Sequence, residues 1–97
     1  MTTIEFTRDA EQDLIDIFLH GVAQFGSNQA ERYLDRINTQ IEIAAQHPDF
    51  GSDYSFVMAG LRRYEVTSHA VYYRVTSSGI LVLRVLHGRM DPGRHLY

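Results

Sequence analysis

The chain contains no cysteine, no tryptophan and no lysine among its 97 residues, and it has only two prolines. Without cysteine, the protein forms no disulfide and offers no thiolate for catalysis or metal binding. All nine basic side chains are arginines. Arginine is suited to bidentate contacts with carboxylates and to stacking on aromatic rings. The composition therefore favours contacts with acidic groups over thiol or lysine chemistry.

Long apolar runs are also missing, since no stretch approaches the roughly 18 residues that a membrane-spanning helix requires. The first residues lack the basic region and apolar segment of a signal peptide. We therefore expect a cytoplasmic protein that does not contact a membrane. The length of 97 residues and the 44% hydrophobic content predict a single globular domain, residues 1–97.

The net charge of −3 is unevenly distributed. Residues 1–53 hold ten acidic residues and three arginines, a balance of −7, whereas residues 54–97 hold two acidic residues and six arginines, a balance of +4. A general nucleic-acid-binding domain is usually basic as a whole. We therefore expect no direct sequence-specific binding of nucleic acid, and an acidic partner for the C-terminal half.

Apolar spacings of three, four and seven residues predict two amphipathic helices. Thr7 is expected to cap a helix over 8–25, Ser27 is expected to cap a second over 28–46, and Pro48 is expected to end it. The short connection predicts an antiparallel helical hairpin. The side chains expected to pack this hairpin onto a sheet are Leu14, Ile17, Phe18, Leu34, Ile37 and Ile41.

The last third of the chain is rich in Val, Ile, Leu and Tyr and predicts three consecutive strands, after a short one at residues 3–6. Turn residues at 67–68 and 76–79 separate them, which favours antiparallel pairing. Residues 49–59 read as a loop that packs against the domain. The predicted fold is α+β, in the order β-α-α-β-β-β, with the helical hairpin packed on an antiparallel-rich sheet.

Arginines recur inside these apolar strands, and each costs free energy unless its guanidinium reaches water or an acceptor. We therefore expect one cationic, partly hydrated sheet face. Candidates for ion pairs with a partner protein are Arg62, Arg74 and Arg84. The residues after the last strand have no obvious core to join, so they form either a simple cap on the sheet or a target-binding surface. The candidates for that surface are His87, Arg89, Met90, Asp91, Arg94, His95 and Leu96.

Other chemistries receive little support. The five histidines are scattered without helical i, i+4 spacing, so no metal site and no cofactor are expected. No serine stands in a hydrolase motif. A nuclease surface built from arginines, His87 and Tyr97 is one interpretation of the C-terminal half, and a protein-binding patch is the other. Spacing does not choose between them, and no catalytic residue is assigned.

The segments Gly60-Leu-Arg, His69-Ala-Val-Tyr-Tyr and Arg84-Val-Leu-His-Gly-Arg-Met-Asp-Pro-Gly-Arg-His-Leu96 resemble a ParE-type toxin of the RelE/ParE superfamily. The runs Ala10-Glu-Gln-Asp-Leu-Ile-Asp-Ile and His47-Pro-Asp-Phe-Gly51 agree with that resemblance. It implies the toxin of a type II toxin–antitoxin module, associated with plasmid stabilisation. Such a toxin inhibits DNA gyrase without catalysis of its own and is neutralised by a ParD-like antitoxin.

RelE-type relatives instead cleave messenger RNA in the ribosome with a lysine-containing active site. Arg62 and Arg84 resemble their phosphate-binding arginines, and Tyr97 resembles a late catalytic tyrosine. The missing lysines and the acidic net charge favour the ParE branch. An mRNA endonuclease and a non-toxic protein-binding module remain the alternatives.

Overall fold

A computed structural model describes residues 2–96 and confirms the predicted α+β order. Its elements are β1 (Thr3–Phe6), α1 (Arg8–Phe25), α2 (Ser27–Gln46), the 3-10 turn η1 (Pro48–Phe50), β2 (Ser52–Asp53), β3 (Leu61–Val66), β4 (His69–Val75), β5 (Gly79–His87) and α3 (Pro92–His95). The strand β2 and the helix α3 are additions to the predicted set. No helix in the described part of the chain is long and apolar enough to cross a membrane.

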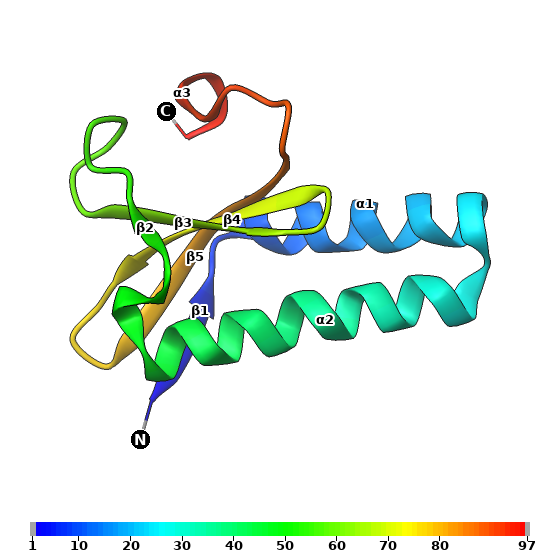
Figure 1. Cartoon of the computed structure of the whole chain (residues 1–97), viewed down its shortest axis with the longest axis horizontal. Coiled ribbons are helices and arrows are strands. Elements are labelled where there is room, and N and C mark those ends of the chain that lie inside the picture. The colour runs from blue at the N-terminus through cyan, green and yellow to red at the C-terminus, as the bar shows by residue number, and fades with distance from the viewer. Residues whose placement is uncertain (1, 97) are drawn as a thin grey trace.

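The five strands form one mixed sheet in the order β1-β5-β4-β3-β2. The N-terminal strand β1 pairs parallel to β5, and every other pair is antiparallel. Figure 1 shows α2 running below the sheet, while α3 stands above it. The sheet therefore has a helix-facing side and a far side, and the two sides carry different side chains.

The two long helices begin and end as their local sequence requires. Thr7 caps α1, because its Oγ1 accepts a hydrogen bond from the backbone N–H of Ala10 at 3.0 Å. The expectation that Ser27 caps α2 is wrong, since Ser27 is already the first helical residue and Gly26 occupies the cap position. Gly26 has φ 87°, a left-handed conformation that glycine adopts without strain, so one residue both ends α1 and starts α2.

The main core lies between the helical hairpin and the sheet. Its buried members are Ala10, Ile37, Ile41, Ala44, Ala45, Tyr64, Val66, Val71, Tyr73, Ile80, Val82 and Val85, with Leu14 and Ile17 packed against them. The expectation that Phe18 and Leu34 join this core is wrong. Both line a shallow groove along the hairpin instead. The 18 residues of α1 extend for about 27 Å, and the hairpin projects past the sheet (Figure 1).

A second apolar cluster covers the far side of the sheet. Leu61, Ala70, Tyr72 and Leu86 are buried there, and Tyr54, Val57, Met58, Leu83 and Leu96 pack on them. The loop that follows β2 is therefore packed against the domain, as its apolar residues indicated. Both sides of the sheet thus bury apolar surface, although only one of them is covered by long helices.

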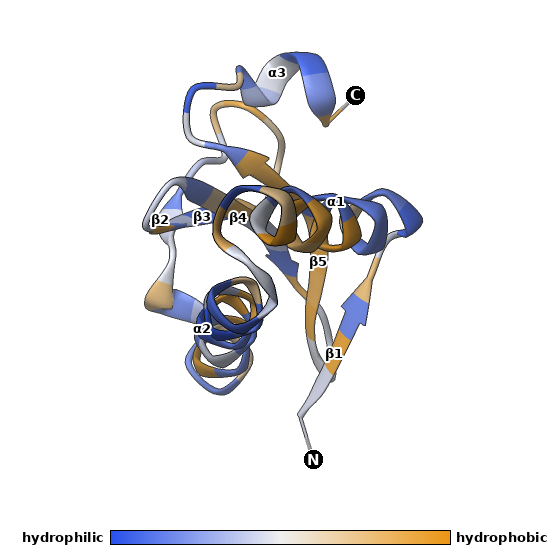
Figure 2. Ribbon diagram, turned by 90° about the vertical axis from the view of Figure 1, so that its right-hand side faces the viewer, coloured by the Kyte–Doolittle hydropathy of each residue, from blue (hydrophilic) through white to orange (hydrophobic). Residues whose placement is uncertain are grey.

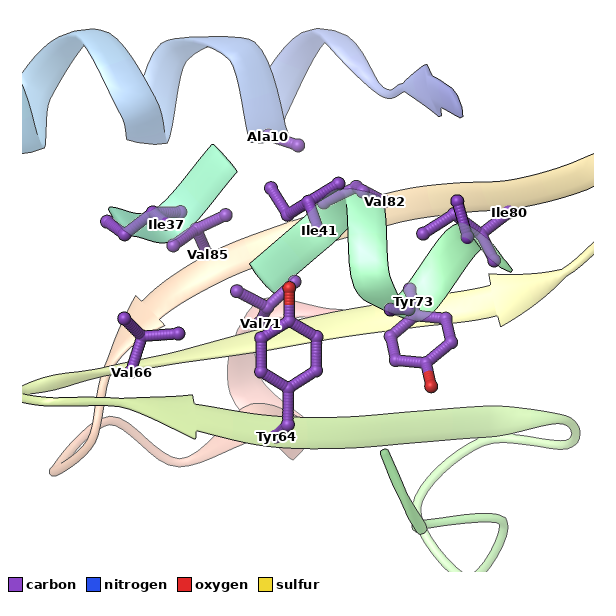
Figure 3. Packing of buried hydrophobic residues seen from close by; sticks show 12 residues of the cluster. Ala10, Ile37, Ile41, Tyr64, Val66, Val71, Tyr73, Ile80, Val82 and Val85 are labelled. Carbon is purple, nitrogen blue, oxygen red and sulfur yellow. The ribbon is translucent and has the colours of Figure 1, made fainter. Parts of the chain in front are cut away.

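Two buried tyrosines, Tyr64 and Tyr73, lie on neighbouring strands of the sheet (Figure 3). Their hydroxyl groups differ in hydrogen bonding. The hydroxyl of Tyr73 donates to the Pro48 carbonyl at 2.7 Å and accepts from the Gly51 N–H at 2.8 Å. It thereby fastens η1 to the sheet. A Cβ at Gly51 would lie 2.7 Å from the same hydroxyl, so this close approach requires glycine. The hydroxyl of Tyr64 is buried and has no hydrogen-bond partner within residues 2–96.

We expect Tyr73→Phe to lower the free energy of unfolding by about 1–3 kcal/mol, because it leaves the buried Gly51 N–H and the partly buried Pro48 carbonyl unpaired. Tyr64→Phe removes only an unpaired hydroxyl from the core, so its free energy of unfolding should equal or exceed that of the wild type. Urea denaturation of both variants measures the difference. A loss of the same size in both would contradict this account of the two hydroxyls.

Candidate functional site

The second half of β5 has no neighbouring strand on one side, because β1 pairs only with residues 79–82. The first turns of α1 take the place of that strand. The hydroxyl of Thr7 donates to the Leu83 carbonyl at 2.7 Å, and a carboxylate oxygen of Asp13 accepts from the Val85 N–H at 2.9 Å. The exposed edge of β5 is thus hydrogen-bonded by side chains of the segment that opens α1.

Asp13 also forms a bidentate ion pair with Arg84. Arg84 Nε and Nη2 each donate to a carboxylate oxygen at 2.8 Å, and Nη1 donates to the His95 carbonyl at 3.0 Å. The hydrogen bonds that Arg84 donates to Asp13 raise the pKa of Arg84, against the opposing effect of burial. A bidentate pair of this kind is among the stronger charged contacts in proteins. It connects α1, β5 and α3.

The strand arginines do not share one face, so the expectation of a single cationic sheet face is wrong. Arg62 lies opposite Tyr73, on the helix-facing side, and its Nε donates to the Gly51 carbonyl at 2.9 Å. Arg84 lies opposite Tyr72, on the far side. The register of the sheet places Arg62 and Arg84 on opposite faces, because directly opposed residues project to the same face.

Arg63 and Arg74 lie on the far side of the sheet. The guanidinium carbon of Arg63 lies 5.3 Å from the ring centroid of Tyr54 and 5.7 Å from that of Tyr72, and the side chain pairs with Glu65 at 3.0 Å. Arg63 therefore packs against aromatic rings of the second apolar cluster and stabilises it. Arg74 is exposed, and its guanidinium has no hydrogen-bond or ionic partner among residues 2–96.

The C-terminal tail, residues 88–96, is divided between two surfaces. Met90 lines a cleft beside the helical hairpin, whereas Leu96 packs on the far side of the sheet. Asp91 caps α3 by accepting from the Gly93 N–H at 3.0 Å. The exposed members of the tail include Arg89 and Arg94. Tyr97, considered above as a catalytic residue, lies outside the described residues.

The cleft has a volume of about 980 Å³ and lies between the distal half of the hairpin, the β3–β4 turn and the end of β5. Its walls combine aromatic, apolar and cationic side chains. Among them are His20, Phe25, Tyr33, Arg36, His69, His87 and Met90. An apolar cleft with positive charge at its border suits an amphipathic peptide with acidic side chains.

His69, the first residue of β4, is a hydrogen-bonded structural histidine. The Tyr33 hydroxyl donates its one proton to the Val66 carbonyl at 2.9 Å, so the 2.6 Å contact with His69 Nδ1 has the imidazole as donor. Burial lowers the pKa of His69, and the neighbouring His87 and His20 lower it further. The ring is therefore neutral near pH 7.

The meeting of three histidines at this cleft was not visible in the sequence, because they come from three separate elements. The rings of His69 and His87 lie 5.6 Å apart. Within residues 2–96 no group of three or more histidine or carboxylate side chains has an arrangement that could hold a metal ion. The cluster shapes the cleft wall through aromatic contacts.

We expect Arg84→Ala to lower the free energy of unfolding by about 3 kcal/mol. The substitution leaves the half-buried Asp13 carboxylate without its ionic partner and removes the hydrogen bond to α3. Arg84→Lys should recover only part of the loss, since one ammonium cannot bind the carboxylate in a bidentate manner and also reach His95. Arg94→Ala is the control, because its 3.9 Å ion pair with Asp91 is exposed. Equal losses for Arg84→Ala and Arg94→Ala in urea denaturation would contradict the role of Arg84.

Comparison with known proteins identifies the family. Residues 4–92 match the family model described as ParE toxin of type II toxin–antitoxin system, parDE. The chain is 35% identical to Toxin ParE1 of Caulobacter vibrioides over 96 residues, which cover 99% of both chains. It is 40% identical to Toxin ParE1 of Mycobacterium tuberculosis over 74 residues, which cover 75% of this chain and 76% of the relative.

A solved structure gives the same answer for the fold. It is titled "Chromosomal ParDE TA system from P. aeruginosa" and superposes with a TM-score of 0.77 at 25% identity, covering 90% of this chain and 96% of the other. The fold, with its sheet and helical hairpin, and the sequence comparison therefore indicate the same family. The chain belongs to the family of ParE toxins of type II toxin–antitoxin systems.

Proposed function

We propose that this ParE toxin acts by inhibiting DNA gyrase and is neutralised by a ParD-like antitoxin. The observation that carries the proposal is the match to the ParE family over residues 4–92. The solved relative is titled a ParDE system, which supports an antitoxin of the ParD type for this chain. The gyrase target follows from the resemblance of the sequence to ParE-type toxins.

The arrangement of the arginines supports a binding protein over a nuclease. Arg62 and Arg84, the candidates for phosphate contacts in a RelE-type enzyme, lie on opposite faces of the sheet. Both guanidinium groups are hydrogen-bonded within the chain. A scissile phosphate held between them would require both to leave these partners. Inhibition through binding needs no such rearrangement.

The helical hairpin is the proposed docking surface for the antitoxin. The helix α1 exposes Ile15, Leu19 and Phe25, whose exposed fractions are 51%, 59% and 62%. Ile15 and Leu19 are four residues apart and share one face, and Phe25 borders the cleft at the distal end of the hairpin. An amphipathic antitoxin helix that lies along the hairpin would bury these side chains, with an extended segment continuing along the sheet.

Of the three strand arginines proposed for antitoxin contacts, only Arg74 has a guanidinium without a partner in the described chain. Arg62 is bonded to the Gly51 carbonyl, and Arg84 is paired with Asp13. We propose that Arg74 is available for a new ion pair. Arg62 and Arg84 contribute by holding η1 and α3 in place.

The tail is the proposed target-binding surface. Arg89 and Arg94 are exposed there, Met90 is 45% exposed, and Arg84 holds α3 through the His95 carbonyl. Exposed arginines beside an apolar anchor suit a protein surface that carries carboxylates. Asp91 shapes this surface by capping α3.

Purified toxin should abolish supercoiling by gyrase in vitro, and an equimolar amount of its antitoxin should restore it. The same toxin should leave messenger RNA intact when added to translating ribosomes. Supercoiling assays and RNA gels, run on one preparation, measure both activities. Ribosome-dependent RNA cleavage with gyrase unaffected would overturn the proposal and place the chain with the RelE-type enzymes.

The double variant Arg89→Ala/Arg94→Ala tests the tail. Both side chains are exposed, so the free energy of unfolding should change by less than about 0.5 kcal/mol. Gyrase inhibition should nevertheless fall, because the cationic contacts are lost. Arg8→Ala/Arg32→Ala, on the exposed faces of the two helices, removes the same charge elsewhere and is the control. Full inhibition by the tail variant would exclude these arginines from the target contact.

A further inference from the structure

The loop that connects β2 to β3, residues 54–60, presents one exposed aromatic side chain. The ring of Phe56 is 78% exposed, more than any other large hydrophobic side chain in residues 2–96. Its neighbours Tyr54, Val57 and Met58 are turned inward and pack on the second apolar cluster, on the far side of the sheet. Phe56 thus stands exposed beside three apolar side chains that are partly buried, in a position where a partner protein could bury its ring.

The loop holds Phe56 in a fixed position. The Tyr54 N–H donates to the Leu61 carbonyl at 2.9 Å, and the Leu61 N–H donates to the Met58 carbonyl at 3.0 Å, which closes the loop at its base. The Phe56 ring lies 4.7 Å from the ring of Tyr54, in a tilted contact. Gly60, with φ 76°, allows the chain to turn back into β3. Because the anchor is already ordered, binding loses little conformational entropy.

The loop and the tail lie on the same side of the sheet. Tyr54, Val57 and Met58 from the loop and Leu96 from the tail all pack on the cluster that contains Tyr72 and Leu86. In both ribbon views the loop after β2 and α3 rise on the side opposite α2 (Figures 1 and 2). The loop and α3 therefore both lie over the far side of the sheet.

The charges on this side complement an acidic partner. The side chain of Arg94 in α3 is 84% exposed, and its 3.9 Å ion pair with Asp91 lies at the surface. The acidic helices α1 and α2 lie on the other side. An apolar anchor with an exposed guanidinium group on the same side of the sheet fits a protein surface that has an apolar pocket bordered by carboxylates.

We infer that Phe56 anchors the toxin to its protein target, and that the loop and the tail bind that target together from the far side of the sheet. This inference rests on the proposed function, because it concerns the same target as the tail. The hairpin stays available to the antitoxin on the opposite side. Phe56 then contacts the target and not the antitoxin helix.

Phe56→Ala tests the inference, with Phe25→Ala as a matched control. Both replace an exposed phenylalanine, at 78% and 62% exposure, so both variants should unfold at nearly the wild-type urea concentration. Phe56→Ala should raise the toxin concentration needed for half-inhibition of gyrase about tenfold or more, as expected for an interface anchor. Its affinity for the antitoxin, measured by calorimetry, should stay at the wild-type value. Phe25→Ala should inhibit gyrase at the wild-type concentration and should bind the antitoxin more weakly.

Wild-type gyrase inhibition by folded Phe56→Ala would overturn the inference. So would a loss confined to antitoxin affinity, which would assign the loop to the antitoxin. If wild-type toxin leaves gyrase active, the proposed target fails, and the inference is then decided by growth arrest in cells without antitoxin. Under that readout, Phe56→Ala should permit growth and Phe25→Ala should still arrest it. Arrest by both variants would overturn the inference.

Discussion

The ion pair between Asp13 and Arg84 is the contact on which the arrangement of this toxin depends. One carboxylate accepts both from the Arg84 guanidinium and from the Val85 N–H, and so replaces the strand that β5 lacks beyond β1. The same guanidinium reaches the His95 carbonyl and holds α3 over the far side of the sheet. The start of α1, the last strand and the tail are therefore positioned together.

The sheet separates two surfaces with different chemistry. The hairpin covers one side and presents an apolar stripe and a cleft, whereas the far side carries a smaller apolar cluster beneath a loop and α3. Figure 2 shows the polar α3 at one end of the molecule and the amphipathic α2 at the other. Under the proposals above, the antitoxin helix binds along the hairpin, and the target binds the loop and α3 on the far side of the sheet.

The elements that follow from short-range rules were predictable from the sequence. Thr7 caps α1 as expected, Pro48 follows the end of α2, and three strands lie where Val, Ile, Leu and Tyr accumulate. The two-residue strand β2 was missed, because Ser52 and Asp53 have little intrinsic strand preference. Hydrogen bonds from Gly51 to Tyr73 and from Arg62 to Gly51 hold the preceding residue against the sheet, beside this pairing.

The candidate site depended on long-range geometry and was less predictable. Arginines in a strand look equivalent until the register is known, and the register places Arg62 and Arg84 on opposite faces. The partner of Arg84 lies 71 positions away in the chain, in a run of acidic residues that resembles an ordinary helix start. The exposure of Phe56 was also hidden, since its apolar neighbours in the loop are turned inward.

Hydrogen exchange of the toxin, free and in complex with each partner, tests the assignment of one partner to each side most directly. Antitoxin should slow exchange in α1, in α2 and around the cleft, and should leave the amides of residues 55–59 unchanged. Gyrase should slow exchange in the loop, residues 54–60, and in the end of the tail, residues 92–96, with the distal hairpin unchanged. Protection of the same segments by both partners would contradict the separation of the two surfaces.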